Sequence, residues 1–307
     1  TVFGQVNKEL PELGDRVSGA ISDAEVELLS EQFLQQVYSQ APIISDPLIF
    51  DYTEYLIYRL SEYSQVKDRS FTLLLIDDPS LNAFAAPGGI IGVNGGLFLY
   101  SDNEGQFSSV LAHELAHLSQ RHFARNVLKS QDSNLASALV MVSSIAIALI
   151  SNNPNAIAVG PAILQSQSLR YSRLFEREAD RVGFDNLVKA GYHPDSMGEM
   201  FENMAYLRRL YGDNIPEFLR THPITSSRIS DAFNAADQVP EIEGKKNSLN
   251  YQLIRGRLSA QYEEIPINAV RIFKDRLVNE RTIENKYGYF TVSYTHLRAH
   301  ETGRNLV

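Results

Sequence analysis

Residues 108–125 read SSVLAHELAHLSQRHFAR, with HELAH at the centre from His113 to His117. Apolar side chains recur here at helical spacing, so we predict one amphipathic helix that begins near residues 102–103. Two histidines four positions apart lie on one face of a helix, where both imidazoles can bind the same metal ion. Glu114 lies one position round the helix and can reach a water molecule beside that metal. This HExxH arrangement favours zinc, because a catalytic zinc site needs three protein ligands and one open position.

A third zinc ligand is expected on another element, and the segment FEREAD at 175–180 supplies a candidate on a second predicted helix. Glu176 and Asp180 are four positions apart and share one helix face. Glu176 can complete the zinc coordination, while Asp180 can accept the free ring N–H of a ligating histidine and fix its tautomer. The alternative is a solvated helix face, because arginines stand between and beside these carboxylates. The upstream HExxH favours the metal interpretation.

In chain order these motifs resemble the HtpX and CAAX-prenyl-protease family of zinc metallopeptidases. The HExxH is followed by the ExxxD helix and preceded by NAFA at 82–85 and by Gly88-Gly89. Further motifs resemble the soluble periplasmic BepA-type branch of that family, namely DPLI at 46–49, SDNE at 101–104, QRH at 120–122 and THP at 221–223. The resemblance covers roughly residues 20–290. It implies an α+β, mainly α, zincin-like metallopeptidase domain with a small β-sheet beside the HExxH helix.

Short strands are predicted upstream of that helix. The apolar run FTLLLI at 71–76 is typical of a buried strand. The glycine-rich segment that follows contains two more apolar stretches with a tight bend at 87–89. The resemblance implies that the NAFA strand borders the cleft. A substrate would then add to it as an extended strand through backbone hydrogen bonds, in contact with Asn82, Ala83 and Phe84.

The resulting prediction is a zinc endopeptidase with one Zn²⁺ per chain. His113, His117 and Glu176 are the predicted metal ligands. Glu114 is the predicted general base, which takes a proton from water and passes it to the leaving amine. Asp180 is predicted to orient a ligating histidine.

His222 and Arg228 are further candidates. The proline at position 223 favours an extended backbone for His222, so we expect this histidine in a loop. A loop histidine is ordinarily a surface or hydrogen-bonding residue, but the same THP motif occurs in the BepA-type branch. We therefore predict that His222 gates the enzyme by occupying the open zinc position; stabilisation of the transition state is the alternative role. Arg228 is a candidate for stabilising oxyanion charge, or else a surface cation.

Composition narrows the class of protein. With 307 residues and 44% hydrophobic content, the chain can bury the core of one large domain or two. A net charge of −9 argues against a nucleic-acid-binding surface. The absence of cysteine excludes disulfides, thiolate ligands and a cysteine nucleophile. The chain starts at Thr1 without a signal peptide and reads as mature or fragmentary, so the periplasmic location implied by the resemblance stands as the expectation.

Residues 133–169 contain no charged side chain, and their core at 135–150 is mainly apolar. That core is shorter than the roughly 20 residues that a membrane-spanning helix needs. A buried helical hairpin or a mobile lid is favoured, and peripheral membrane contact through 135–150 remains the alternative.

We divide the chain into a metallopeptidase domain at 1–239, a linker at 240–246 and a helical region at 247–291. The resemblance implies that this helical region opens a tetratricopeptide-like (TPR-like) repeat array. Such arrays need about three repeats to be stable, so we expect the natural protein to be longer. Residues 292–307 begin with VSYTHLRAHET, which matches the translation of a common sequencing-library adaptor, and we assign them no role.

The resemblance implies a role in quality control and assembly of outer-membrane proteins. Unfolded or misassembled outer-membrane proteins are then the expected partners, together with the outer-membrane assembly machinery. The alternative function is that of a chaperone or adaptor in which proteolysis is secondary. A catalytically dead scaffold would be expected to lose Glu114, which this sequence retains.

Overall fold

The computed structural model describes most of the chain. The described residues are 22–129, 172–212, 215–240, 243–263 and 265–304. The apolar segment 133–169, with its proposed membrane contact at 135–150, lies outside the described residues. Within the described ranges, no helix combines the length and the apolar character that crossing a membrane requires.

Three short strands form a mixed sheet, as the sequence predicts. They are β1 (Thr72–Ile76), β2 (Ala83–Ala86) and β3 (Ile90–Asn94), in the spatial order β1-β3-β2. β1 runs parallel to β3 and β2 runs antiparallel to it, so β2 is an edge strand. The bend between β2 and β3 places Gly88 and Gly89 at φ 77° and 74°, in the left-handed region that glycine tolerates.

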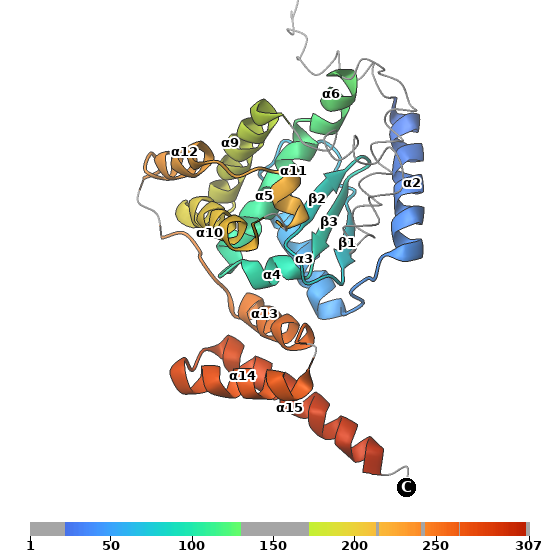
Figure 1. Cartoon of the computed structure of the whole chain (residues 1–307). Helices are drawn as coiled ribbons and strands as arrows, with labels where there is room; N and C mark the ends of the chain where they lie inside the picture. Colours follow the sequence, from blue (N-terminus) through green and yellow to red (C-terminus); the bar gives the residue numbers. More distant parts are fainter. Residues whose placement is uncertain (1–21, 130–171, 213–214, 241–242, 264, 305–307) are drawn as a thin grey trace, which may run out of the picture.

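Helices cover both faces of this sheet (Figure 1). Helix α2 (Asp23–Gln40) packs against one face, and helices α3 (Pro47–Ser61) and α5 (Glu104–Ser119) pack against the other. The side chains of the strands therefore alternate between two apolar clusters, and nearly all of them are buried. The α2 side of the sheet contains Leu74, Ile76, Phe84, Ala86 and Ile90.

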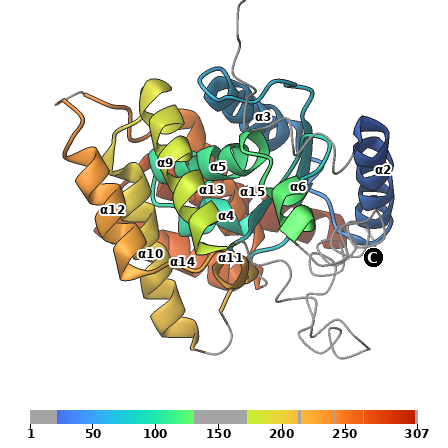
Figure 2. The same cartoon turned by 90° about the horizontal axis from the view of Figure 1, so that it is seen from above.

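Helix α5 is the central helix of the molecule (Figure 2). It begins at the predicted place, because the Asn103 side chain accepts a hydrogen bond from the Gln106 N–H and caps the helix. The prediction of one helix through residue 125 is wrong. The chain leaves α5 after Ser119, and Arg121 takes a left-handed φ of 52° before α6 (His122–Lys129) begins.

Helix α9 (Arg173–Lys189) lies directly against α5. The two helices approach closely because small residues line their contact, namely Ala112 and Ala116 on α5, and Ala179 on α9. A Cβ atom at Gly183 would lie 3.0 Å from the carbonyl oxygen of Ala112, so a larger residue there would push the helices apart. This close approach brings the carboxylates of α9 to the histidines of α5.

Three more helices surround this pair. They are α10 (Asp195–Tyr211), the short α11 (Glu217–Thr221) and α12 (Ser226–Ala236). Thr225 caps α12, since its side chain accepts from the Arg228 N–H. The segment between α11 and α12 carries His222, which lies beside His113 of α5 and Glu176 of α9.

The C-terminal helices are α13 (Leu249–Gln261), α14 (Pro266–Asn279) and α15 (Ile283–Arg304). They lie beyond α4 (Gly96–Tyr100), at the lower end of the molecule in Figure 1. The buried Tyr251 attaches α13 to the body, because its hydroxyl donates to the Ser101 carbonyl oxygen at 2.9 Å. α15 packs against both α13 and α14.

Candidate metal centre

Four side chains from three separate segments converge on one buried point. His113 and His117 come from α5, Glu176 from α9, and His222 from the end of α11. Each is at most 3% exposed. One potential ligand atom from each lies within 4.8 Å of the corresponding atoms of the other three. The structure thus brings together the three predicted ligands and His222, the residue predicted to occupy the open position.

The two helical histidines face each other through their Nε2 atoms, which are 3.0 Å apart. Glu176 lies beside both, with its carboxylate oxygens 3.6 Å from each of these nitrogens. The Nδ1 atom of His222 lies 3.0 Å from Oε1 of Glu176 and 3.4 Å from Nε2 of His113. Nitrogen and carboxylate donors of this kind are those that zinc prefers.

Asp180 lies on the outer side of His113, where its Oδ1 is 3.1 Å from Nδ1 of that histidine. A carboxylate in this place pairs with the Nδ1 side of the imidazole and leaves Nε2 directed at the metal position. Asp180 is held in turn by Arg228, whose Nε and one terminal nitrogen each lie 2.6 Å from the carboxylate. The other terminal nitrogen of Arg228 lies 2.8 Å from Glu176.

Arg228 is therefore neither a surface cation nor a free oxyanion donor, the two possibilities that the sequence left open. It is 5% exposed, and its guanidinium contacts Asp180, Glu176 and the carbonyl oxygen of Pro223. Arg228 binds two carboxylates that face the histidines. It therefore fixes the position of the predicted ligand Glu176 and of Asp180, the partner of His113.

His122 supports the second helical histidine, a role that the sequence analysis missed. Its Nδ1 lies 2.9 Å from Nδ1 of His117, and its Nε2 lies 3.2 Å from Oε2 of Glu178. Burial lowers the pKa of His122 to about 4 despite the nearby Glu178, so its imidazole is neutral at pH 7. His117 can then donate its Nδ1 proton to His122, which donates its own Nε2 proton to Glu178.

The break between α5 and α6 makes this contact possible. In one continuous helix, residues 117 and 122 would be about 140° apart around the axis and would not meet. The left-handed Arg121 turns the chain back, so that His122 returns to His117. The motif QRH contained the relevant histidine, but helical periodicity alone places it on the wrong face.

We expect His122→Phe to weaken zinc binding about 10–100-fold, because removing an outer hydrogen-bond partner of a metal-binding histidine typically costs that much. Phenylalanine fills the space and keeps the stacking on Phe175, which now lies 4.6 Å from the imidazole. His122→Asn is the matched control, since its side-chain oxygen can replace Nδ1 as acceptor. Competition with a fluorescent zinc chelator measures both affinities. Equal losses in the two variants would contradict the assigned role.

Glu114 lies beside the cluster and is 1% exposed. Its Oε1 makes no hydrogen bond within the described residues and lies 3.7 Å from Nε2 of His222. Burial raises its pKa, although the nearby His222 and His113 and the Ala85 main chain oppose the effect. A buried carboxylate with a free oxygen and a raised pKa is suited to accept a proton.

The pKa values of His113 and Glu176 are shifted by their neighbours in the cluster. Burial would lower the pKa of His113, but Asp180 and Glu176 outweigh it and raise the pKa to about 9. Burial would raise the pKa of Glu176, but His222, His113 and Arg228 hold it well below its usual range. Without a metal, His113 therefore holds an extra proton at neutral pH, and metal binding must release it.

The residues fit a metal ion. Asp180 and His122 occupy the Nδ1 atoms of His113 and His117, so both Nε2 lone pairs are directed into one small volume. Two such lone pairs 3.0 Å apart repel each other unless a proton or a metal ion lies between them, and a metal ion takes the place of that proton. The carboxylate of Glu176 supplies the negative charge that a divalent ion requires.

The predicted substrate-binding residues lie at and beside the edge strand. Ala83 and Phe84 belong to β2, and Asn82 precedes it. The Phe84 ring packs against Phe33 of α2, with ring centroids 5.8 Å apart, and faces away from α5. Phe84 therefore offers a substrate only its main chain. Among the described residues β2 pairs with β3 on one side, and its other edge has no strand partner.

Taken together, a helix-borne HExxH, an acidic ligand on a following helix and a buried glutamate beside them define the HExxH metallopeptidase class of site. The model of peptidase family M48 matches residues 49–236. The chain belongs to peptidase family M48.

Relatives of known name agree with this assignment. The chain is 32% identical over 265 residues to a putative beta-barrel assembly-enhancing protease of Vibrio cholerae, covering 85% of this chain and 54% of that protein. It is 31% identical over 262 residues to the beta-barrel assembly-enhancing protease of Escherichia coli, covering 85% and 53%. The mitochondrial metalloendopeptidase OMA1 of Arabidopsis thaliana is 29% identical over 165 residues, which are 54% of this chain and 31% of that protein. The chain spans about half the length of the first two relatives.

Proposed function

We propose that this chain is a zinc-dependent endopeptidase that binds one Zn²⁺ through His113, His117 and Glu176. The observation that carries the proposal is the buried convergence of these three side chains beside the free carboxylate oxygen of Glu114. Membership of a metallopeptidase family supports it. The test is zinc analysis together with casein cleavage by the wild type and Glu114→Gln, argued in the Discussion.

In this mechanism Glu114 takes a proton from the attacking water and delivers it to the leaving amine. Its raised pKa places proton uptake and release nearer to neutral pH than for an exposed carboxylate. A zinc ion at this site would polarise the scissile carbonyl and make water more acidic. Asp180 and His122 hold the two imidazoles in the tautomers that ligation requires, and Arg228 holds Asp180.

The edge strand β2 is proposed to bind the substrate backbone. An extended peptide can pair with its open edge, as in other cases of strand addition. β2 packs against α5, and the Ala85 main chain lowers the pKa of Glu114, so this strand lies beside the general base. A peptide on this edge would thereby lie next to the catalytic carboxylate.

We further propose that the protein acts in the bacterial periplasm on unfolded or misassembled outer-membrane proteins. The names of the two bacterial relatives and the BepA-type motifs support this proposal. We propose that α13–α15 open a TPR-like region that contacts such partners, since α15 packs on both neighbours in the manner of stacked helical pairs.

A chaperone or adaptor role is the second candidate function. The relatives' names describe assembly enhancement as well as proteolysis, and this supports a chaperone or adaptor role as the second candidate. The variant Glu114→Gln distinguishes the two functions. A chaperone would still prevent aggregation of an unfolded β-barrel protein, whereas a pure protease would lose all effect.

His222 is proposed to gate the enzyme as a fourth donor that closes the open metal position. We expect His222→Ala to raise casein cleavage and self-cleavage several-fold while zinc stays bound, because three ligands remain. The matched control is His193→Ala, which also removes a histidine that precedes a proline but lies outside the cluster. A fall in activity with zinc retained would assign His222 to transition-state stabilisation. Loss of zinc would make it a structural ligand.

A further inference from the structure

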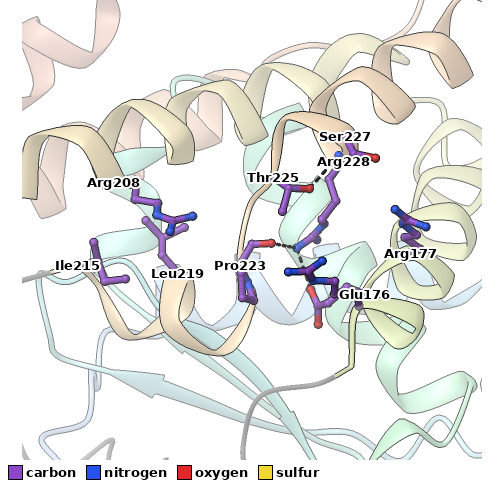
Figure 3. A pocket seen from close by; sticks show the side chains of 10 residues that line it. Glu176, Arg177, Arg208, Ile215, Leu219, Pro223, Thr225, Ser227 and Arg228 are labelled. Atoms are coloured by element: carbon purple, nitrogen blue, oxygen red, sulfur yellow. Dashed lines mark hydrogen bonds and ion pairs between the residues drawn. The ribbon is translucent and has the colours of Figure 1, made fainter. Parts of the chain in front are cut away.

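A pocket of about 400 Å³ opens next to the metal cluster. It lies between the start of α9, the end of α10 and the segment that links α11 to α12 (Figure 3). Glu176 lines it, and so does Pro223, the residue after His222. A peptide held at the cluster would therefore place a neighbouring side chain or its terminus in this pocket.

The lining of the pocket is strongly cationic. Four of its ten lining residues are arginines: Arg173, Arg177, Arg208 and Arg228. Its acidic lining residue is Glu176, which His222 and Arg228 already hold. The pocket consequently has an excess of positive charge in a protein whose net charge is −9.

Three of these arginines have a positive charge that no carboxylate of the described residues neutralises. Arg228 is buried and neutralised by Asp180 and Glu176. Arg173, Arg177 and Arg208 are exposed, and no carboxylate of the described residues forms an ion pair with them. Figure 3 shows Arg177 and Arg208 on opposite sides of Arg228. Arg177 and Arg208 can thus contact an anion that enters from solvent, one from each side.

The remaining lining residues are the apolar Ile215, Leu219 and Pro223 and the hydroxyl-bearing Thr225 and Ser227. An apolar wall beside guanidinium groups suits a ligand with a short hydrocarbon part and a charged end. A glutamate side chain has this form, and so does the last residue of a peptide with its free carboxylate. Guanidinium binds carboxylates through charge-assisted hydrogen bonds in planar geometry.

We propose that this pocket is a substrate subsite that binds a carboxylate of the peptide close to the scissile bond, with Arg177 and Arg208 as the specificity-determining residues. The proposal rests on the proposed peptidase function, since it assigns a preference to the same site. The preferred substrate is a peptide with an acidic side chain near the cleaved bond; a free C-terminus is the other source of the same group.

The test uses a synthetic decapeptide around a cleavage site mapped in casein, with both ends blocked. Glutamate or glutamine is placed in turn at each of the flanking positions, and kcat/KM is measured for each pair. At one position we expect glutamate to be favoured about tenfold, the effect of one partly exposed charge-assisted hydrogen bond. The double variant Arg177→Gln, Arg208→Gln should abolish that preference, because kcat/KM falls about tenfold more for the glutamate peptide than for the glutamine peptide.

The charge-matched control is Arg181→Gln, Arg209→Gln, which removes two arginines of the same helices that do not line the pocket. It should keep the preference. A third peptide with glutamine and a free C-terminus separates the two sources of carboxylate: arginine-dependent preference for this peptide alone would assign the pocket to the terminus. The same preference in wild type and pocket variant, or equal loss in the control, would overturn the proposal.

Binding of the fluorescein-labelled glutamate peptide to Glu114→Gln provides a readout that needs no cleavage. We expect fluorescence anisotropy to give about tenfold weaker binding when the two pocket arginines are also replaced. If no peptide is cleaved but this difference remains, the proposed function fails and the carboxylate site stands. If peptides are cleaved without any arginine-dependent difference, the subsite fails and the peptidase stands.

Discussion

Replacing Glu114 by glutamine should lower peptide cleavage about 10²–10⁴-fold, the range that general-base catalysis usually contributes. Glutamine has nearly the same shape but cannot take up the proton. Bound zinc should stay the same, because Glu114 lies outside the group of donors that converge on the metal position. Casein cleavage and zinc content measured on the same preparation give both numbers.

The control for this change is Glu202→Gln, an identical substitution at an exposed position of α10. It should leave activity and zinc content unaltered. Burial of Glu114 at 1% exposure could make its variant less stable, so the thermal unfolding midpoint is compared as well. Undiminished cleavage by a folded, zinc-loaded Glu114→Gln protein would refute the assignment of the base.

Replacing Glu176 by glutamine should weaken zinc binding itself, by at least about a hundredfold. This loss exceeds the upper end of what removing an outer hydrogen-bond partner costs, because a charged ligand is lost. The low pKa of Glu176 keeps the wild-type side chain ionised at neutral pH, so the full charge is removed. Arg228 keeps Asp180 as its second carboxylate, and the fold should survive.

Zinc affinity is measured by chelator competition, with Glu202→Gln again as the control. Cleavage should fall in the Glu176→Gln variant and recover in part when excess zinc is added, whereas Glu114→Gln should not recover. Zinc retained after exhaustive dialysis of the Glu176→Gln protein would show that the third ligand lies elsewhere.

Local sequence alone predicted the parts of this protein that depend on neighbours in the chain. Helical periodicity and the four-residue spacing placed His113 and His117 on one face of α5. The start of α5 was predicted near residues 102–103, where Asn103 caps the helix. The three strands followed from short apolar runs and the Gly88-Gly89 bend. These features are local because backbone hydrogen bonds and side-chain direction fix them within a few residues.

The tertiary structure decided which distant groups meet. The end of α5 at Ser119 cannot be read from an amphipathic pattern that continues to residue 125, and it alone brings His122 to His117. The burial of Arg228 between Asp180 and Glu176 and the pairing of His222 with Glu176 join segments about 50 residues apart. Such contacts depend on how closely α9 packs on α5, which Gly183 permits. Sequence therefore specified the candidate donors, whereas helix packing determined their number, their tautomers and the cationic pocket beside them.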